Sequence, residues 1–337
     1  MKAVALTRYL LIDDPNALLD VELPKPAPRG HELLVRVEAV SINPVDAKLR
    51  APKAQVETTP KVLGYDAAGV VEAVGDAVTL FKPGDEVFYA GDVTKPGTNA
   101  QFHLVDERIT GRKPRTLDFA HAACLPLTAL TAWELLFERF GYDPDGSDRG
   151  RTLLIVAGAG GLGSIAIQLA KRAQLTVVAT ASRPDSIDWC RKMGADHVID
   201  HRQPLRPQLE ALGLRQVDAI ASFSGPEPYW AQYGDIVAPQ GKVGILTTLQ
   251  SALDMNVLKN KSASVHWEFM FTRSMFVTDD IVRQHEILER VAQLIDAGEL
   301  SSTLTDTLRP IDAANLREAH RRIESGSTIG KLAIAGW

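Results

Sequence analysis

Three glycines in the middle of the chain constrain its fold more than any other feature. A buried-strand pattern runs into Gly158, Gly160 and Gly163, which follow the spacing GxGxxG, and an amphipathic helical pattern comes next. In a strand–turn–helix unit of this kind, Gly158 makes the tight turn, Gly160 lets a phosphate approach the backbone and Gly163 lets the helix pack on the strand. The helix N-terminus adds N–H groups and the positive end of its dipole. We therefore predict that this turn, with Gly161 and Leu162, binds the diphosphate of a dinucleotide; a glycine-rich connector in another α/β fold is the alternative.

The periodicity around this turn divides the chain into regions. The first ~120 residues show short β-branched runs bounded by Gly, Pro and Asp, a β-rich pattern. Beyond Pro126 strand and helix patterns alternate, which indicates βαβ units and a parallel sheet. We expect strands over 2–6, 32–42, 67–74, 86–90, 151–157, 176–181, 197–199, 217–223, 242–246, around 265–271 and over 331–335, and helices over 127–137, 161–172, 185–193, 279–297 and 311–325.

The length and charge of the chain indicate how many domains it has and disfavour some classes of binding partner. The chain has 337 residues, enough for two domains of about 100–200 residues each. Its net charge of −5, with mixed signs, disfavours a nucleic-acid surface. No apolar run approaches the ~18 residues of a membrane span, and residues 1–6 read as a strand and not as a secretory signal. We expect a cytoplasmic protein that binds neither nucleic acid nor membrane.

The strand after the glycine helix indicates which nicotinamide dinucleotide the turn would bind. An NAD site usually carries Asp or Glu about 20 residues beyond the glycines, to bind the ribose 2′-hydroxyl. Here that strand ends in Thr180, Ala181, Ser182 and Arg183, and a hydroxyl beside a guanidinium suits a 2′-phosphate. We therefore predict NADP(H), bound by Ser182 and Arg183. In the alternative, these two residues are a helix cap and a solvated charge, and the nearby Asp185 favours NAD.

The cysteine count excludes one kind of metal site. Cys124 and Cys190 are the two cysteines, and neither belongs to a CxxC pair. An all-thiolate structural zinc site needs four cysteines at short spacing, so this chain cannot build one. Disulfide scaffolding and dithiol redox chemistry are disfavoured for the same reason.

Besides the glycine turn, the chain contains the segments SINPVDAK at 41–48, LGYDAAGVV at 63–71, KPGDEV at 82–87 and LTAW at 130–133. Together these segments resemble the medium-chain dehydrogenase/reductases, and the resemblance covers nearly the whole chain. The segment HWEFMFTRSM at 266–275 is similar to a bacterial subgroup of the quinone oxidoreductase branch, labelled zinc-type alcohol dehydrogenase-like.

This resemblance implies an α/β fold class, in which a GroES-like β-rich catalytic domain is interrupted by a doubly wound Rossmann domain. The implied boundaries are 1–125 for the catalytic domain, 126–263 for the Rossmann domain and 264–337 for the return to the catalytic domain. It also implies a homodimer joined through edge strands of the Rossmann domains.

The resemblance also shows where a catalytic zinc would be held. The positions that match the family's zinc ligands are Asn43, the pair Tyr65–Asp66, and approximately Leu127, with Cys124 close to the third position but out of register with it. An amide, a phenol and an aliphatic side chain are not a zinc ligand set. We therefore expect no metal in the site.

Without a Lewis acid, quinones and activated enones are easier hydride acceptors than simple ketones, because their negative charge is delocalised. By the same resemblance, Tyr65 would donate to the substrate oxygen and Asn43 to that oxygen or to the nicotinamide ribose. Asp46 would orient one of these two, Thr131 would lie near the nicotinamide, and His201 near the adenosine phosphate. The predicted function is hydride transfer from NADPH to a quinone or an activated carbonyl compound such as an enone.

Three other functions stay open at this stage. The same residues would serve a 2-alkenal or enoyl reductase, in which a proton must also reach the α-carbon. The branch also resembles lens crystallins, so a nucleotide-binding protein without turnover is a second alternative. A true zinc alcohol dehydrogenase is the third. For Tyr65 the alternative is a packed aromatic ring, for Asp46 a structural turn residue, and for His201 a surface histidine.

Overall fold

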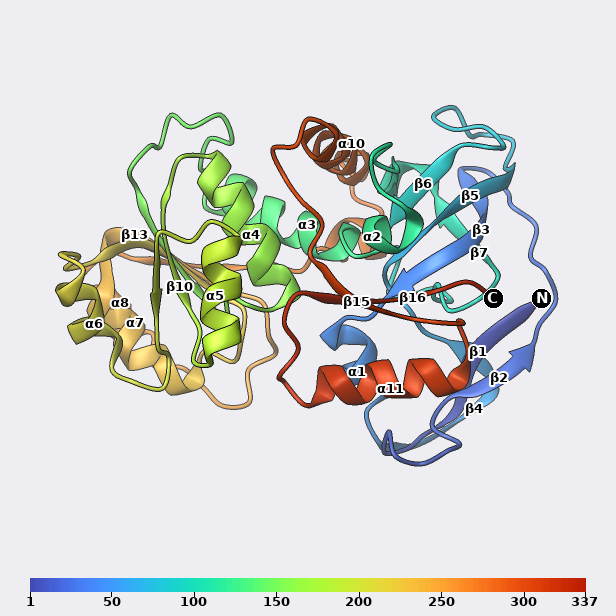
Figure 1. The fold of residues 1–337 in the computed structure, drawn as a ribbon, viewed down its shortest axis with the longest axis horizontal. Helices are drawn as coiled ribbons and strands as arrows, with labels where there is room; N and C mark the ends of the chain where they lie inside the picture. The colour runs from blue at the N-terminus through green and yellow to red at the C-terminus, as the bar shows by residue number, and fades with distance from the viewer. The chain divides into compact units, whose positions relative to one another are not determined.

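The computed structural model describes all residues, 1–337, and the chain divides into two compact units. The first unit combines Met1–Leu130 with Phe271–Trp337, and the second unit is Thr131–Met270 (Figure 1). The chain therefore leaves the first unit once and returns to it.

The first unit is β-rich. Its strands form a three-stranded sheet in the order β2-β1-β4 and a seven-stranded sheet that follows the path β15-β16-β3-β5-β6-β8, with β7 paired to β3. All pairs are antiparallel except β15–β16. The strands are β1 (Lys2–Tyr9), β2 (Leu19–Glu22), β3 (Glu32–Ser41), β4 (Lys53–Val62), β5 (Ala67–Val74), β6 (Glu86–Tyr89), β7 (Phe102–Asp106), β8 (Thr110–Arg112), β15 (Leu304–Leu308) and β16 (Lys331–Ala335).

Helices and short turns cover these sheets. They are α1 (Pro44–Arg50), η1 (Glu107–Ile109), α2 (Phe119–Ala123), α3 (Pro126–Trp133, which continues into the second unit), α9 (Thr272–Phe276), α10 (Arg283–Asp296) and α11 (Ala313–Glu324). Helix α11, near the end of the chain, packs beside α1, near its beginning (Figure 1). Apolar side chains of the strands, such as Leu6, Val37 and Ile334, fill the core beneath them, because alternate residues of each strand point to the same face.

The second unit contains a six-stranded parallel sheet in the order β11-β10-β9-β12-β13-β14. Its central strand, the sequence TLLIV at 152–156, is buried along its whole length, as expected of a parallel strand covered on both faces. The strands are β9 (Thr152–Val156), β10 (Thr176–Thr180), β11 (His197–Ile199), β12 (Val217–Ser222), β13 (Val237–Ile245) and β14 (Ser264–Trp267). In chain order this is 3-2-1-4-5-6, the doubly wound Rossmann arrangement.

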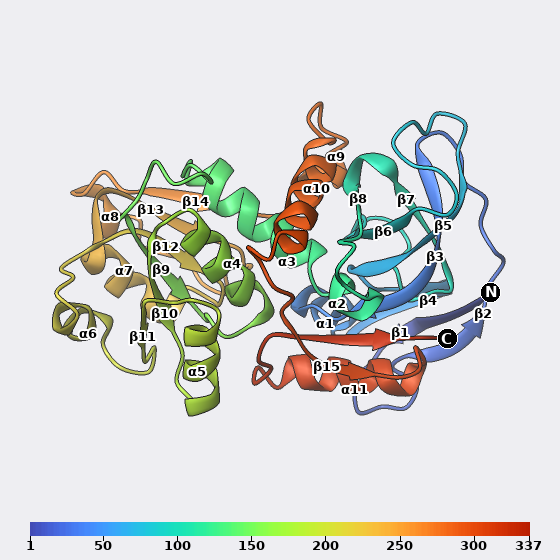
Figure 2. The same cartoon turned by 45° about the horizontal axis from the view of Figure 1, so that its top comes forward.

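Helices lie on both faces of this sheet, as right-handed connections require when the strand order reverses (Figure 2). They are the π-helix η2 (Glu134–Arg139), α4 (Gly161–Arg172), α5 (Pro184–Lys192), α6 (Leu205–Ala211), η3 (Glu227–Tyr229), α7 (Trp230–Ile236) and α8 (Asn256–Lys259). The predicted fold class, a β-rich domain interrupted by a doubly wound parallel α/β domain, is confirmed. No helix in the structure is both long enough and apolar enough to span a bilayer.

One segment differs from the expected organisation. We placed residues 264–337 in the catalytic domain, but β14 pairs with β13 as an edge strand of the parallel sheet. The second unit therefore extends to Met270. The alternation of apolar and polar residues that predicted a strand here carries no information about which sheet the strand joins.

Candidate functional site

The glycine turn connects β9 to α4 in the second unit. An ideal Cβ on Gly163 would lie 2.4 Å from the carbonyl oxygen of Gly158, so only glycine lets the helix approach the turn this closely. A Cβ on Gly160 would meet nothing nearer than the Ala157 oxygen at 3.8 Å, so the space in front of this backbone is open. Close packing behind the turn and open space before it are what a phosphate-binding turn needs.

Gly158 lies in the tight turn, but its backbone conformation does not itself require glycine. The left-handed residue of the turn is Ala157, with φ of 64°, and Gly158 has no positive φ. Gly158 is required instead by packing, since a Cβ there would lie 2.8 Å from the Cβ of Ala179 and 3.1 Å from the sulfur of Cys190. The strained Ala157 is held by Thr180, whose hydroxyl accepts a 3.0 Å hydrogen bond from the Ala157 N–H.

The first turn of α4 offers donors to an anion. The first bond within the helix runs from the Ser164 N–H to the Gly160 oxygen, so the N–H groups of Gly161, Leu162 and Gly163 have no partner inside the helix. No acidic residue lies in this first turn. The chemistry of these residues fits the diphosphate of a nicotinamide dinucleotide, and their contact with one remains a prediction.

The carboxyl ends of β10 and β11 meet beside this turn. Ser182 is half-buried, and Arg183 is exposed at the N-cap of α5. Arg202, which sequence reasoning did not select, donates from Nη2 to the Ser182 carbonyl oxygen at 2.8 Å and forms a forked ion pair with Asp200. Half-buried His201 has no partner for Nδ1, and burial lowers its pKa. The carboxyl ends of β10 and β11 therefore carry basic side chains, and the negative charge of Asp200, the acidic residue there, is paired with Arg202.

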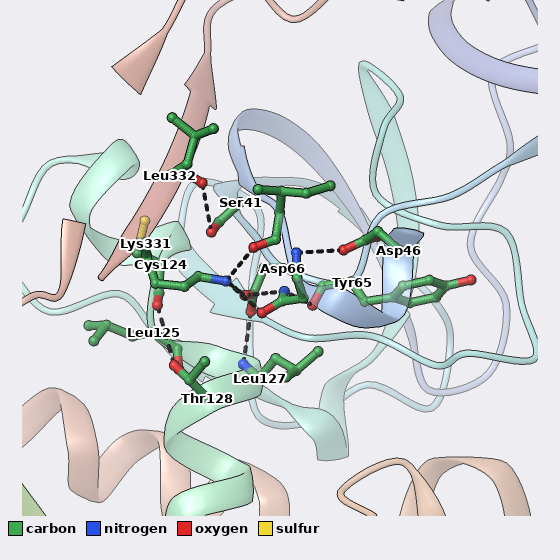
Figure 3. Close-up of polar contacts among 12 residues, drawn as sticks. Ser41, Asp46, Tyr65, Asp66, Cys124, Leu125, Leu127, Thr128, Lys331 and Leu332 are labelled. Carbon is green, nitrogen blue, oxygen red and sulfur yellow. Dashed lines mark hydrogen bonds and ion pairs between the residues drawn. The ribbon is translucent and has the colours of Figure 1, made fainter. Parts of the chain in front are cut away.

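A network of buried polar side chains forms a separate candidate site in the first unit (Figure 3). At its centre is the ammonium group of Lys331, the first residue of β16, which is 3% exposed. Its Nζ donates to the Ile42 oxygen at 2.8 Å, to Oδ1 of Asn43 at 2.6 Å and to Oδ2 of Asp66 at 3.0 Å. The predicted site residue Asn43 is therefore bound to a buried cation.

Both carboxylate oxygens of Asp66 accept hydrogen bonds. Its Oδ2 also accepts from Nδ2 of Asn43 at 2.7 Å, and its Oδ1 accepts from the Leu127 N–H at 2.8 Å. Burial raises the pKa of Asp66, while Lys331 and these two donors oppose the shift by stabilising the carboxylate. The three positions matched to zinc ligands, Asn43, Asp66 and Leu127, are thus brought into contact by hydrogen bonds and not by a metal.

The donor set at these positions does not fit zinc. The side chains of Asn43 and Asp66 are hydrogen-bonded to Lys331 and to each other. Leu127 donates its backbone N–H to Asp66, and neither this N–H nor its aliphatic side chain can bind a metal ion. Cys124 is completely buried, and burial raises the pKa of its thiol to about 12. No three His, Cys, Asp or Glu side chains in the structure lie close enough together to hold a metal ion.

Asp46 lies in α1, next to this network. Its Oδ2 accepts from the Asn43 N–H at 2.8 Å, and its buried Oδ1 has no hydrogen-bond partner. Burial raises the pKa of Asp46 to about 7, with the Asn43 N–H and Lys331 opposing the shift. Asp46 thus bonds to the backbone of Asn43 at the N-cap of α1, and it makes no bond to the Asn43 side chain or to the Tyr65 hydroxyl.

Tyr65 points away from the Lys331 network (Figure 3). Its ring is 1% exposed and packs edge-on against Phe271, with centroids 5.6 Å apart. Its hydroxyl has no hydrogen-bond partner. Burial raises the pKa of the phenol, so the group stays protonated and can act as a donor. Leaving a buried O–H without a partner costs about 1–3 kcal/mol, which a ligand oxygen would recover.

The remaining predicted residue, Thr131, is the first residue of the second unit, where it is buried in α3. Its proximity to a nicotinamide remains a prediction.

Two residues of these sites were missed at the sequence level. Lys331 was included only as the start of a strand, because a lysine at that position is usually exposed. The apolar residues that follow it, LAIA, signal a buried strand but not a buried cation. Arg202 follows directly after His201, and its pairing with Asp200 is the kind of contact that a DxR spacing permits in a turn.

Comparison with known proteins places this geometry in a family. The model of the alcohol dehydrogenase GroES-like domain matches residues 29–114, and the zinc-binding dehydrogenase model matches residues 193–334. A zinc-type alcohol dehydrogenase-like protein of Staphylococcus epidermidis is 40% identical over 335 residues, which is 99% of each chain. A chloroplastic quinone-oxidoreductase homolog of Spinacia oleracea is 29% identical over 322 residues, which is 95% of this chain and 94% of that protein.

A solved structure agrees with this assignment. A Rhizobium etli protein, provisionally described as a zinc-dependent alcohol dehydrogenase, is 52% identical, with a TM-score of 0.95, and the match covers 100% of this chain and 98% of that one. The β-rich unit is thus GroES-like, and the parallel sheet is a Rossmann domain. The chain belongs to the medium-chain dehydrogenase/reductase superfamily, as an oxidoreductase of the branch that holds the zinc-type alcohol dehydrogenase-like proteins and the quinone oxidoreductases.

Proposed function

We propose that this protein is a zinc-independent, NADPH-dependent reductase that transfers hydride to a quinone or an α,β-unsaturated carbonyl compound. The observation that carries the proposal is the Lys331–Asp66–Asn43 network, which fills with hydrogen bonds the positions that match the family's zinc ligands. A reductase with this site cannot polarise a simple carbonyl through a metal at these positions. An acceptor whose developing charge is delocalised does not require that help.

The residues divide the work between binding and proton donation. The N–H groups of Gly161, Leu162 and Gly163 would bind the diphosphate, and Ser182, Arg183 and His201 would bind the 2′-phosphate. NADPH, when bound, supplies the hydride. The Tyr65 hydroxyl would donate to the substrate oxygen as negative charge develops there. Asn43 and Asp46 hold the chain next to Tyr65 in place.

A panel of initial rates tests the proposal. Purified protein is given NADPH or NADH together with a quinone, an enone or, in the oxidised direction, a primary alcohol. We expect turnover with NADPH and the quinone or enone, and at most a slow reaction with the alcohol. Tight NADPH binding without oxidation by any acceptor would favour a non-catalytic nucleotide-binding protein, and preferred alcohol oxidation would favour a zinc alcohol dehydrogenase.

The Tyr65→Phe variant separates a quinone reductase from an alkenal or enoyl reductase. The substitution keeps the ring packed against Phe271 and removes only the unpartnered hydroxyl. Removing a general acid typically costs 10²–10⁴-fold in rate. If proton delivery to an enone uses this hydroxyl, enone turnover falls by at least ~10²-fold and quinone turnover falls less. Equal losses on both acceptors would contradict this assignment.

We further propose that the protein works as a cytoplasmic homodimer. Strand β14 is an edge strand, and its Trp267 is 54% exposed, which suits pairing with a second copy. Light scattering coupled to size-exclusion chromatography should give twice the mass of 36.7 kDa. A monomer at micromolar concentration would contradict the proposal.

A further inference from the structure

A side chain of helix α5 is linked to the glycine turn of the second unit through the hydroxyl of Ser164 in α4. Trp189 lies in α5, which packs beside α4 (Figures 1 and 2). Its indole Nε1 donates to Oγ of Ser164 at 2.7 Å, and Oγ of Ser164 donates to the Gly160 carbonyl oxygen at 2.7 Å. Ser164 is completely buried.

The direction of this hydrogen-bonded chain is fixed by its chemistry. An indole N–H can only donate, and a hydroxyl has one proton, so the Ser164 hydroxyl accepts from Trp189 and gives its proton to Gly160. The Ser164 N–H donates to the same oxygen at 2.9 Å. The Gly160 carbonyl is therefore held toward the helix by two donors from Ser164.

Holding this carbonyl also orients an N–H group on the opposite side. The Gly160 C=O and the Gly161 N–H belong to one trans peptide plane, so they point in opposite directions. A carbonyl turned into the helix leaves the Gly161 N–H turned outward, into the open space in front of Gly160. The next residue of α5 supports the same turn, since the Cys190 sulfur lies 3.1 Å from where a Cβ on Gly158 would be.

We propose that Trp189 and Ser164 are positioning residues for the diphosphate group of the dinucleotide, because they fix the peptide that presents the Gly161 N–H. This inference rests on the proposed function, which places a nicotinamide dinucleotide on the turn. It adds that α5 contributes to diphosphate binding through Trp189, in addition to the 2′-phosphate contacts expected of Arg183 at its N-cap.

Two substitutions and a matched control test the proposal. Trp189→Phe keeps an aromatic ring and removes the indole N–H, and Ser164→Ala removes the hydroxyl that links it to Gly160. The control is Trp230→Phe, because Trp230 is a buried tryptophan of the same unit whose indole donates at 2.8 Å to the Asp254 oxygen, away from the turn. The affinity for NADPH is measured by titration calorimetry, together with the melting temperature and kcat at saturating NADPH.

The loss of one such hydrogen bond corresponds to a change of about three- to tenfold in an equilibrium constant. We expect the Kd for NADPH to rise by this factor in Trp189→Phe and in Ser164→Ala, with kcat changed less than about twofold. Because the two residues act in series, the double variant should be no weaker than about the weaker single variant. Trp230→Phe should leave the Kd unchanged, although its melting temperature falls.

A nuclear magnetic resonance readout does not depend on turnover. The chain has five tryptophans, and the Trp189 indole N–H signal is assigned by its absence in Trp189→Phe. Addition of NADPH should shift this signal more than the Trp230 signal. An unchanged Kd in both Trp189→Phe and Ser164→Ala, with only a lower melting temperature, would overturn the positioning role and leave the proposed function intact. Wild-type protein that binds neither NADPH nor NADH would overturn both.

Discussion

Lys331→Met removes the cation on which the buried network of the first unit depends. The ammonium makes hydrogen bonds to the Ile42 oxygen at 2.8 Å, Asn43 Oδ1 at 2.6 Å and Asp66 Oδ2 at 3.0 Å. Methionine fills a similar volume and replaces none of these bonds, so the Asp66 carboxylate is left buried without a counter-ion. Breaking a buried ion pair from one side costs about 3–5 kcal/mol of folding free energy.

Urea unfolding at pH 7.5, followed by circular dichroism, measures this loss. The double variant Asp66→Asn/Lys331→Met removes both charges, and we expect it to be more stable than Lys331→Met, because no unpaired charge is then buried. The pH dependence gives a second readout. Without Lys331, the pKa of Asp66 rises further above its unfolded value, so its contribution to stability is lost as pH increases. The deficit of Lys331→Met relative to wild type should therefore shrink between pH 8 and pH 5.

Two outcomes would refute this reasoning. A Lys331→Met protein within about 1 kcal/mol of wild type would mean that Asp66 is already neutral or that another cation replaces Lys331. A double variant less stable than the single variant would mean that the hydrogen bonds of Asp66, and not its charge, dominate the network.

Two further predictions concern the stability and the coenzyme preference of the protein. His320 is fully buried, neither of its ring nitrogens has a hydrogen-bond partner, and burial lowers its pKa from 6.5 to about 3. Below about pH 6.5 this imidazole is therefore protonated in the unfolded chain but stays neutral in the folded chain. Between pH 7.5 and 5.0, wild type should lose about 2 kcal/mol more stability than His320→Leu, as measured by urea unfolding, and parallel losses would contradict this. Arg183→Glu places an acid where we expect the 2′-phosphate, so the ratio of kcat/KM for NADPH to that for NADH should fall by about ten- to a hundredfold. An unchanged ratio in a kinetic comparison of the two coenzymes would remove Arg183 from the site.

Helices and strands whose sequence signals lie among neighbouring residues could be predicted from local patterns. The helix expected over 161–172 and the strand expected over 331–335 have the observed bounds, because a glycine turn, a helical period and an apolar run are each local signals. The parallel sheet of the second unit was predicted from the alternation of strands and helices, and the family resemblance implied its doubly wound arrangement. Strand β4 was missed because its residues, KAQVETTPKV, are mostly exposed and show no apolar alternation.

Contacts between distant segments could not be predicted in the same way. Lys331 and Asp66 are 265 positions apart, and nothing local to either residue indicates that they pair. The indole of Trp189 reaches Ser164 across 25 positions, and the helical pattern of 185–193 predicted the helix but not this contact. The motif shows where glycines are required but not which residue of the turn has a positive φ, so the left-handed conformation of Ala157 could not be predicted.

We propose that this oxidoreductase works without zinc, and removal of bound metal is the test of that proposal. The protein is dialysed against a strong chelator, its metal content is measured by mass spectrometry, and NADPH oxidation by a quinone is then assayed with and without added Zn²⁺. We expect substoichiometric metal and an unchanged rate in both assays, because Lys331, Asn43 and Asp66 are hydrogen-bonded to one another. Loss of activity on chelation that stoichiometric zinc restores would contradict it.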